Sequence, residues 1–419
     1  TDPGRVAVIG GARLSNESAR AWARLAHDVV GTPHVDAQLG DGLPAEVLGL
    51  PRATIDEVCA PGGTVVVIAG DIKEELPVLF LRLKHAVQHD RVRLIEIAST
   101  RTGLSPYVTE SITHRPGEAA AAVAALLERG DVGDIKVVLG RASVAEAASL
   151  TVDAAALLAA RPGTTFLPAL RRANVIGALS AGLRPGAGGN DTTATLAAAA
   201  EGKIDTLILL GADPLADFPD AALAERALAR TRTVIAIDQF LTESSQRADI
   251  VLAAAGFAEV DGTTTNIEGR VSAVNTKVTP PGTARPDWLL ASEIADRLGR
   301  PLGDEPLFDD ETLAALAVDT NADGVIPSPT DAWNVPAWVA PTPTGTSGTD
   351  AYALRVVAGR RLYDQGTLLQ HCSSSAGLAG DAVARIGTDD ASKLGITDGV
   401  RVRLSAHDRS ISLPAHVDA

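Results

Sequence analysis

The feature that most constrains this chain is a regular alternation of short β-branched runs with alanine- and leucine-rich stretches over its first 300 residues. The runs are apolar on both faces, which is typical of central strands in a parallel sheet covered by helices. They lie at residues 5–9, 64–68, 93–97, 135–139, 206–210 and 233–237. Helices are predicted at residues 16 to about 30, 73–89, from 116, 143–160 and from 220. The pattern predicts an α/β fold with two Rossmann-like parallel-sheet units.

The pattern changes after residue 317. Five prolines fall between Pro327 and Pro343, which favours an extended, proline-rich linker over residues 318–349. Short alternating runs at 354–357, 400–404 and 411–413, with turns at 397–399 and 407–408, predict a small β-barrel domain at 350–419, truncated where the chain stops. Residues 1–317 then form the α/β region. Two intertwined units are expected within it, about 1–115 with 190–317 and about 116–189.

Cysteine is scarce in this chain. Its 419 residues include only Cys59 and Cys372, far apart in the sequence. An iron–sulfur cluster normally takes four thiolate ligands, so this stretch of chain cannot hold a cluster alone. The two separated thiols also favour a reducing compartment without disulfides.

The charge and hydropathy of the chain argue against two classes of partner. The net charge is −15, which repels phosphate backbones, and no basic stripe is visible. No apolar run reaches the roughly 18–20 residues that a membrane-spanning helix needs. We expect no nucleic-acid binding and no direct insertion into a membrane. The chain begins at Thr1 and contains no methionine, so we expect that a preceding segment is missing.

Polar residues follow two of the predicted strands at their carboxyl ends, where open α/β sheets bind ligands. Gly211 and Asp213 follow one strand, and Asp238 and Thr242 follow the next. These four residues are the candidate cofactor-binding cleft. An aspartate there either holds a ribose hydroxyl or caps a helix, and the sequence favours capping.

Two glycine-rich segments could approach an anion. Gly10 and Gly11 follow the first strand without the spacing of a dinucleotide-binding motif, which favours a tight strand-to-helix turn. The loop at residues 183–190 combines an arginine with small residues, so both anion wrapping and a flexible surface loop remain open.

No catalytic or metal-binding motif is visible. The eight histidines are dispersed, and His371 beside Cys372 lacks a third ligand nearby. No nucleophile–base pair can be assigned from spacing. We therefore predict no catalytic residue and no metal site.

Several segments resemble the molybdopterin-dinucleotide oxidoreductase superfamily, and most closely its branch in respiratory complex I, where it forms the large peripheral-arm subunits. The most specific run spans residues 255–270, followed by Pro280-Pro281-Gly282 and Asp287-Trp288. The other segments are residues 4–10, 34–42, 73–77, 211–214, 359–364 and 389–395. The resemblance implies two units of the molybdopterin oxidoreductase type followed by a double-psi-like barrel.

The resemblance also carries implications for cofactors. In active members, a cysteine, selenocysteine or serine in the segment that matches residues 34–44 binds the metal, and this chain has none there. Asp36 and Asp41 are the anionic candidates, and surface or capping roles suit them better. The resemblance implies that molybdopterin has been lost. It also implies that iron–sulfur clusters are bound by N-terminal domains, which are missing from this chain.

The resemblance thus implies a non-catalytic scaffold in NADH:quinone oxidoreductase. The implied partners are other peripheral-arm subunits, and the implied location is cytoplasmic, peripheral to the membrane through the complex. The first alternative is an active molybdopterin-dinucleotide oxidoreductase of the formate dehydrogenase type. The second is a small-molecule or nucleotide-binding module at the candidate cleft.

Overall fold

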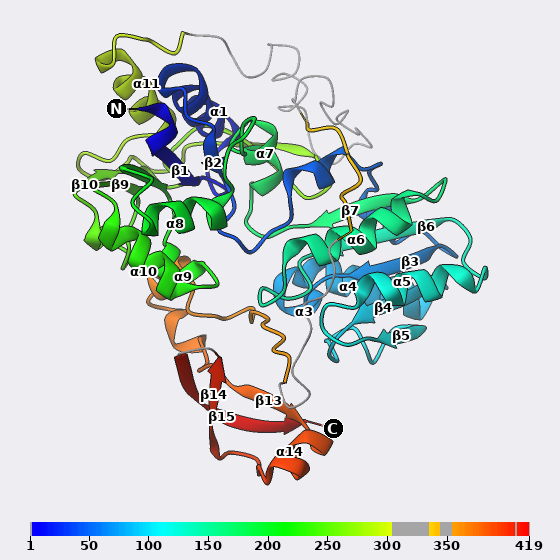
Figure 1. Ribbon diagram of the computed structural model, residues 1–419. Helices are drawn as coiled ribbons and strands as arrows, with labels where there is room; N and C mark the ends of the chain where they lie inside the picture. Colours follow the sequence, from blue (N-terminus) through cyan, green and yellow to red (C-terminus); the bar gives the residue numbers. More distant parts are fainter. Residues whose placement is uncertain (1, 304–334, 344–353, 407–408, 419) are drawn as a thin grey trace. The chain divides into compact units, whose positions relative to one another are not determined.

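A computed structural model describes residues 2–303, 335–343, 354–406 and 409–418 (Figure 1). The chain divides into a large unit, Thr1–Leu362, and a small unit, Tyr363–Ala419.

The first sheet of the large unit has the strand order β10-β9-β8-β1-β2, and every neighbouring pair is parallel. Its strands are β1 (Val6–Gly10), β2 (His34–Asp36), β8 (Thr206–Leu210), β9 (Thr233–Asp238) and β10 (Ile250–Ala253). β1 and β8 are almost wholly buried, which explains why their sequences are apolar on both faces.

The second sheet has the order β5-β4-β3-β6-β7 and is also parallel throughout. Its strands are β3 (Thr64–Ile68), β4 (Arg93–Ala98), β5 (Glu110–Thr113), β6 (Ile135–Gly140) and β7 (Thr165–Ala169). All five lie between β2 and β8 in the sequence. The second sheet is therefore a continuous segment placed inside the sequence of the first.

Helices follow most strands, as expected for parallel crossovers. Those of the large unit are α1 (Asn16–Arg24), α2 (Ile55–Val58), α3 (Ile72–Glu75), α4 (Pro77–His89), α5 (Ala119–Glu128), α6 (Ala148–Ala159), α7 (Val175–Ser180), α8 (Thr192–Ala200), α9 (Pro214–Asp217), α10 (Ala221–Arg230) and α11 (Asp287–Arg297). A π-helical turn (Leu25–Val30) extends α1, and short 3-10 turns lie at Pro3–Arg5, Ala45–Gly49 and Ser245–Arg247. A hairpin of β11 (Gly262–Thr265) and β12 (Val271–Val274) precedes α11.

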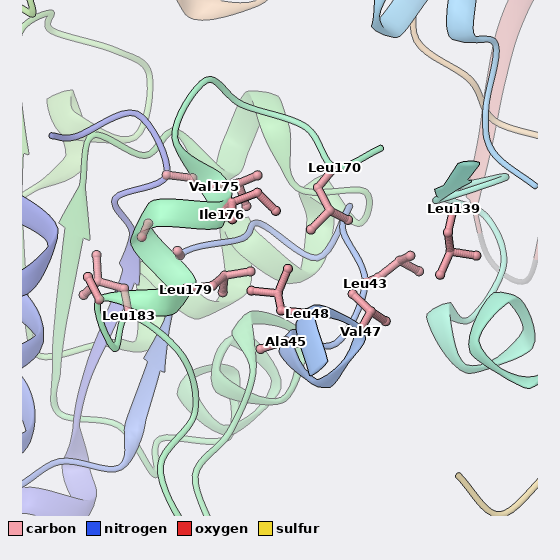
Figure 2. Close-up of a cluster of buried hydrophobic side chains, with 14 of the residues drawn as sticks. Leu43, Ala45, Val47, Leu48, Leu139, Leu170, Val175, Ile176, Leu179 and Leu183 are labelled. Atoms are coloured by element: carbon pink, nitrogen blue, oxygen red, sulfur yellow. The ribbon is translucent and has the colours of Figure 1, made fainter. Parts of the chain in front are cut away.

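One hydrophobic core runs between the two sheets. Figure 2 shows Leu43, Val47 and Leu48 of the segment after β2 pointing toward α7 on one side and toward β6 on the other. Their partners include Leu179 of α7 and Leu139 of β6, in the same buried cluster. Apolar burial thus joins the two sheets.

The small unit contains a mixed sheet of three strands in the order β13-β15-β14. Its elements are β13 (Ala384–Gly387), β14 (Arg401–Ala406), β15 (Arg409–Asp418), α13 (Thr367–Gln370), α14 (Thr388–Leu394) and a 3-10 turn at Ala376–Leu378.

The predicted α/β fold class, with a β-rich C-terminal part, is confirmed. The six predicted strands of the two sheets are present within one residue at each end. The strand predicted at 354–357 is wrong, since those residues are irregular, and the Arg355 side chain donates to the Pro116 oxygen. The helices predicted from 116 and 143 begin later, at Ala119 and Ala148. Residues 318–334, 344–349 and 407–408 of the predicted linker and turn lie outside the described residues.

The strand pairing also differs from the predicted grouping of the two α/β units. β3, β4 and β5 pair with β6 and β7, not with β1 and β8. The predicted grouping failed because single strands of a parallel sheet do not reveal their neighbours. The domain boundaries remain a prediction.

Candidate functional site

The carboxyl ends of the two parallel sheets bring together a group of arginines around two buried carboxylates. The group comprises Arg13 after β1, Asp41 after β2, Arg171 and Arg172 after β7, Asp217 at the end of α9, and Arg360. We call this group the ionic cluster. All six residues lie in the large unit.

Asp41 lies at the centre of the ionic cluster and is fully buried, at 0% exposed. Its Oδ1 accepts a hydrogen bond of 2.7 Å from Arg172. Its Oδ2 lies 3.6 Å from Arg171 and 3.8 Å from Arg360. Burial alone would raise the pKa of Asp41, but the three guanidinium groups outweigh it and lower this pKa to about 2. The expectation of a surface or capping role for Asp41 was therefore wrong.

Asp217 is the second carboxylate of the ionic cluster, at 3% exposed. Arg360 donates to its Oδ1 at 3.1 Å and to its main-chain oxygen at 2.6 Å. Arg172 and Arg13 each lie 3.8 Å from its Oδ2. Arg172 and Arg360 thus contact both carboxylates and link the loops that follow β2, β7 and β8.

Arg172 is the most deeply buried cation of the ionic cluster. Its side chain is 7% exposed, and its backbone has a φ of 77°, which is uncommon for a residue with a side chain. Burial opposes its charge, yet Asp41 and Asp217 raise the pKa of Arg172 overall. The left-handed backbone is one of the local strains that functional or tightly packed sites tolerate.

Arg360 belongs to an irregular segment, residues 354–362, that contacts the loops of both sheets. Ala358 exchanges hydrogen bonds with the loop after β6, through Ser143 Oγ at 3.0 Å and the amide of Val144 at 3.2 Å. The Leu362 amide donates to Glu74 of α3 at 2.9 Å, and Arg355 donates to the Pro116 oxygen.

The four predicted cleft residues lie after β8 and β9, but most of their polar side-chain atoms form hydrogen bonds with the loop that follows β9. Asp213 is buried, and its Oδ1 accepts hydrogen bonds from the amide and hydroxyl of Ser244 at 3.2 and 2.5 Å. Thr242 Oγ1 accepts from the Ser245 amide at 3.1 Å, as a turn cap does.

Asp238 and Gly211 complete this set. Asp238 Oδ1 accepts from the amide of Gln239 at 2.7 Å, and burial raises the pKa of Asp238. Gly211 has a φ of 54° with open space where a Cβ would lie. The structure thus places these residues at neighbouring strand ends, with Asp213 and Thr242 bracing the loop after β9.

The glycine-rich segments have structural roles. Gly10 and Gly11 form the tight turn that was predicted, and a Cβ on Gly10 would lie 2.4 Å from the Leu210 oxygen. In the loop at 183–190, the amides of Gly186 and Asn190 donate to Pro33 O and His34 Nδ1. These amides are directed at the chain itself, so the anion-wrapping alternative has no support from them.

The run at 261–270, which carries the strongest resemblance, includes β11, and its threonines join the β11–β12 hairpin to α1 and to the start of α7. Asn16 Nδ2 donates to Thr263 Oγ1 at 3.0 Å and to Thr265 Oγ1 at 3.1 Å. Asn174 Oδ1 accepts from the Thr265 amide at 2.6 Å, and Asn174 Nδ2 donates to Asn16 Oδ1 at 3.0 Å. We call these four residues the neutral network. They are all buried.

The remaining candidates lie outside both groups. Asp36 is buried and accepts from the amides of Gln38 and Thr192, so its expected capping role fits, and burial raises its pKa to about 6. Cys59 ends α2, where burial raises its pKa. Cys372 is exposed in the small unit, where hydrogen bonds with Ser374 and Ser375 lower its pKa. Both thiols are free.

Sequence reasoning missed the arginines of the ionic cluster. Arg171 and Arg172 follow β7, which was not predicted because Pro168 interrupts its apolar run. Recognition of that strand would have placed both arginines at a carboxyl end. No sequence signal connects Arg360 with Asp217, 143 residues away.

Comparisons with known proteins point to one superfamily. The molybdopterin oxidoreductase family model matches residues 139–297. The G subunit of NADH-quinone oxidoreductase from Mycobacterium tuberculosis is 29% identical over 99% of this chain and 55% of that protein. The alpha subunit of NADPH-Fe(3+) oxidoreductase from Geobacter sulfurreducens is 24% identical over 96% of this chain and 58% of that protein. This chain thus spans somewhat more than half the length of these relatives.

One further match concerns a short stretch of the sequence, and another concerns the fold. The alpha subunit of F420-dependent formate dehydrogenase from Methanocaldococcus jannaschii is 42% identical over 96 residues, 23% of this chain and 14% of that protein. Acetylene hydratase from Pelobacter acetylenicus has a similar fold, with a TM-score of 0.68 at 14% identity over 99% of this chain and 77% of that structure. The chain therefore contains a molybdopterin oxidoreductase domain, and its homologues over most of its length include the G subunits of NADH-quinone oxidoreductases.

Proposed function

We propose that this chain is a non-catalytic scaffold region of the G subunit of the proton-pumping NADH:quinone oxidoreductase. In this role it supports electron transfer from NADH to quinone through iron–sulfur clusters bound outside these residues. The observation that carries the proposal is the state of Asp41. It is one of only two carboxylates between His34 and Pro44, and it is fully buried among guanidinium groups.

The side chains present do not fit the metal of a molybdopterin cofactor. The segment at 34–44 has no cysteine or serine, and Asp36 and Asp41 are committed to amides and guanidinium groups. Cys59 packs against the apolar cluster beside the second sheet. Over the described ranges, no group of three or more His, Cys, Asp or Glu side chains is placed to hold a metal ion. We therefore assign no catalytic step to this chain.

The proposed partners are other subunits of the peripheral arm, since the homologous G subunits belong to a multi-subunit oxidoreductase. None of the helices in the described part of the chain is long and apolar enough to cross a bilayer. The proposed location is on the cytoplasmic side of the membrane, reached through the complex. The net charge of −15 gives no support to nucleic acid as a partner.

Metal and pterin analysis of the purified full-length protein tests the proposal. We expect molybdenum and tungsten far below one atom per chain, and no pterin released on acid treatment. Stoichiometric metal with a pterin would overturn it. Co-purification with tagged peripheral-arm subunits tests the scaffold role separately, and a full-length chain that assembles with none of them would contradict that role.

The second candidate is an active molybdopterin-dinucleotide oxidoreductase of the formate dehydrogenase type. The 42% identity to a formate dehydrogenase alpha subunit over 96 residues favours it. Formate-dependent dye reduction by the full-length protein, isolated from molybdate-supplemented cells, tests this candidate. Activity that disappears when tungstate replaces molybdate would support it, and a lack of activity in both preparations would exclude it.

A further inference from the structure

The arginines of the ionic cluster come from loops far apart in the sequence and converge on two buried carboxylates, Asp41 and Asp217. Arg171 and Arg172 follow β7, Arg13 follows β1, and Arg360 lies in the segment at 354–362. Their charges oppose one another, since Arg172 lowers the pKa of Arg13 and Arg360 lowers that of Arg171, each in addition to burial. Such a group of cations requires anions beside it.

Asp41 and Asp217 supply these anions from within the chain. Each lies within 4 Å of three arginines of the ionic cluster. The pKa of Asp41 is lowered to about 2, so its carboxylate stays ionised at every physiological pH. The carboxyl ends of parallel sheets are where this architecture binds anionic ligands.

We propose that Asp41 and Asp217 are resident counter-ions that occupy the anion position at the carboxyl ends of the two sheets and thereby exclude a diphosphate-bearing ligand. A diphosphate that approached Arg172 or Arg360 would lie beside both buried carboxylates. One that approached Arg171 would lie beside Asp41 and Glu75. Like charges at such separations repel, most strongly where water is excluded. The same contacts hold the segment at 354–362 against the loops of both sheets.

This inference goes beyond the scaffold role, because a scaffold in an electron-transfer complex could still bind an anion. Its subject is the phosphate-binding part of the site, whereas the metal argument above concerns residues 34–44. A negative result for the phosphate-binding proposal would therefore leave the metal argument unaffected, and the reverse also holds.

Pyrophosphate binding to full-length variants tests the proposal. Asp217→Asn and Asp41→Asn keep the side-chain shape and remove one anion. We expect wild type to give no calorimetric heat at millimolar pyrophosphate. Each variant should bind pyrophosphate, with an affinity at least tenfold above the upper limit set by wild type. Each variant should also melt at a lower temperature than wild type and recover part of the difference when pyrophosphate is added. A variant that folds only when pyrophosphate is present would also support the proposal.

Asp205→Asn is the matched control, because Asp205 pairs with Arg5 at the other end of β8 and outside the ionic cluster. We expect no pyrophosphate binding by this variant. Micromolar pyrophosphate binding by wild type would overturn the proposal. So would cluster variants that bind no better than the control, or that fail to fold even with pyrophosphate.

Discussion

Two groups of polar side chains join separate elements of the large unit, and they do so with different chemistry. The neutral network joins the β11–β12 hairpin to α1 and α7 through hydrogen bonds of 2.6 to 3.1 Å. The ionic cluster joins the loops after β2, β7 and β8 to Arg360, with several charged pairs 3.6 to 3.8 Å apart.

The difference shows in which atoms are paired. In the ionic cluster, Asp41 Oδ2, Asp217 Oδ2 and Arg171 Nη1 are buried without a hydrogen-bond partner in the described structure, whereas no side-chain atom of the neutral network is. Neutral groups contribute only when donor and acceptor are aligned, while opposite charges attract over longer distances. The neutral network therefore specifies a geometry, and the ionic cluster balances charge among loops.

The largest expected effect is the loss of Arg172. Arg172→Met removes the cation that contacts both carboxylates and leaves Asp41 without its 2.7 Å hydrogen bond. Breaking a buried pair in this way costs about 3–5 kcal/mol. Urea unfolding measures the free energy, with Arg129→Met, an exposed pair, as the control. Equal stability of the two variants would show that the ionic cluster contributes no more than a surface pair.

The next effect concerns two buried carboxylates with opposite pKa shifts. Burial raises the pKa of Asp287 to about 7, whereas the arginines lower that of Asp41 to about 2. A raised carboxyl pKa favours folding while the group is protonated. Its contribution is fully present below the unfolded pKa of about 3.8 and is lost as the pH rises through about 7. The contribution of Asp41 is present above about 3.8 and is lost as the pH falls toward 2.

Asp287→Asn removes the first of these titrations. We expect the unfolding free energy of wild type to fall by about 2–4 kcal/mol more than that of the variant between pH 4 and pH 8. Urea unfolding at one-unit pH intervals measures this difference. Parallel pH profiles would mean that Asp287 is ionised in the folded chain despite its burial.

A smaller effect is expected in the neutral network. Thr265→Val keeps the side-chain shape but leaves Asn16 without one acceptor, at a cost of about 1–3 kcal/mol. Thr264→Val is the matched control, because alternate residues of a strand face opposite sides. The cost should be constant from pH 5 to pH 8. A similar cost for both variants would show that strand propensity, and not the network, is being measured.

The smallest effect is expected at Gly211, which directly follows β8 and belongs to neither group. Gly211→Ala meets open space, so only its φ of 54° opposes the change, at about 1 kcal/mol. Gly10→Ala is the comparison, since its Cβ would meet the Leu210 oxygen at 2.4 Å and force a backbone shift. Thermal melts rank the two variants. A larger loss at Gly211 would reveal a contact that the strand end requires.

Much of the fold could be predicted because its strands are buried on both faces. Residues 64–68 and 206–210 form β3 and β8 as predicted, since their continuous apolar runs are compatible with few other structures. The other four strands of the two sheets, β2, β5, β7 and β10, were missed. Pro168 interrupts β7, and β10 is a largely exposed edge strand whose four residues carry no alternation.

The candidate site was predicted less well. Asp213 and Thr242 lie after strand ends as predicted, and Thr242 accepts a local hydrogen bond from the Ser245 amide. Asp213 directly precedes α9 without a side-chain capping bond and accepts from Ser244 instead, so the capping expected for it is not seen. Asp41 was expected at the surface and is buried, because its partners come from Arg171, Arg172 and Arg360. Sequence spacing cannot reveal a charge pair that forms only between distant loops.

The sequence alone determined that this chain builds parallel α/β sheets and that residues 34–44 lack a thiolate or hydroxyl ligand, because periodicity and residue identity are local properties. Only the tertiary structure decided which strands share a sheet and that Asp41 and Asp217 meet the same arginines. Those outcomes depend on the crossover connections, which bring strand ends together that are more than 100 residues apart in the chain.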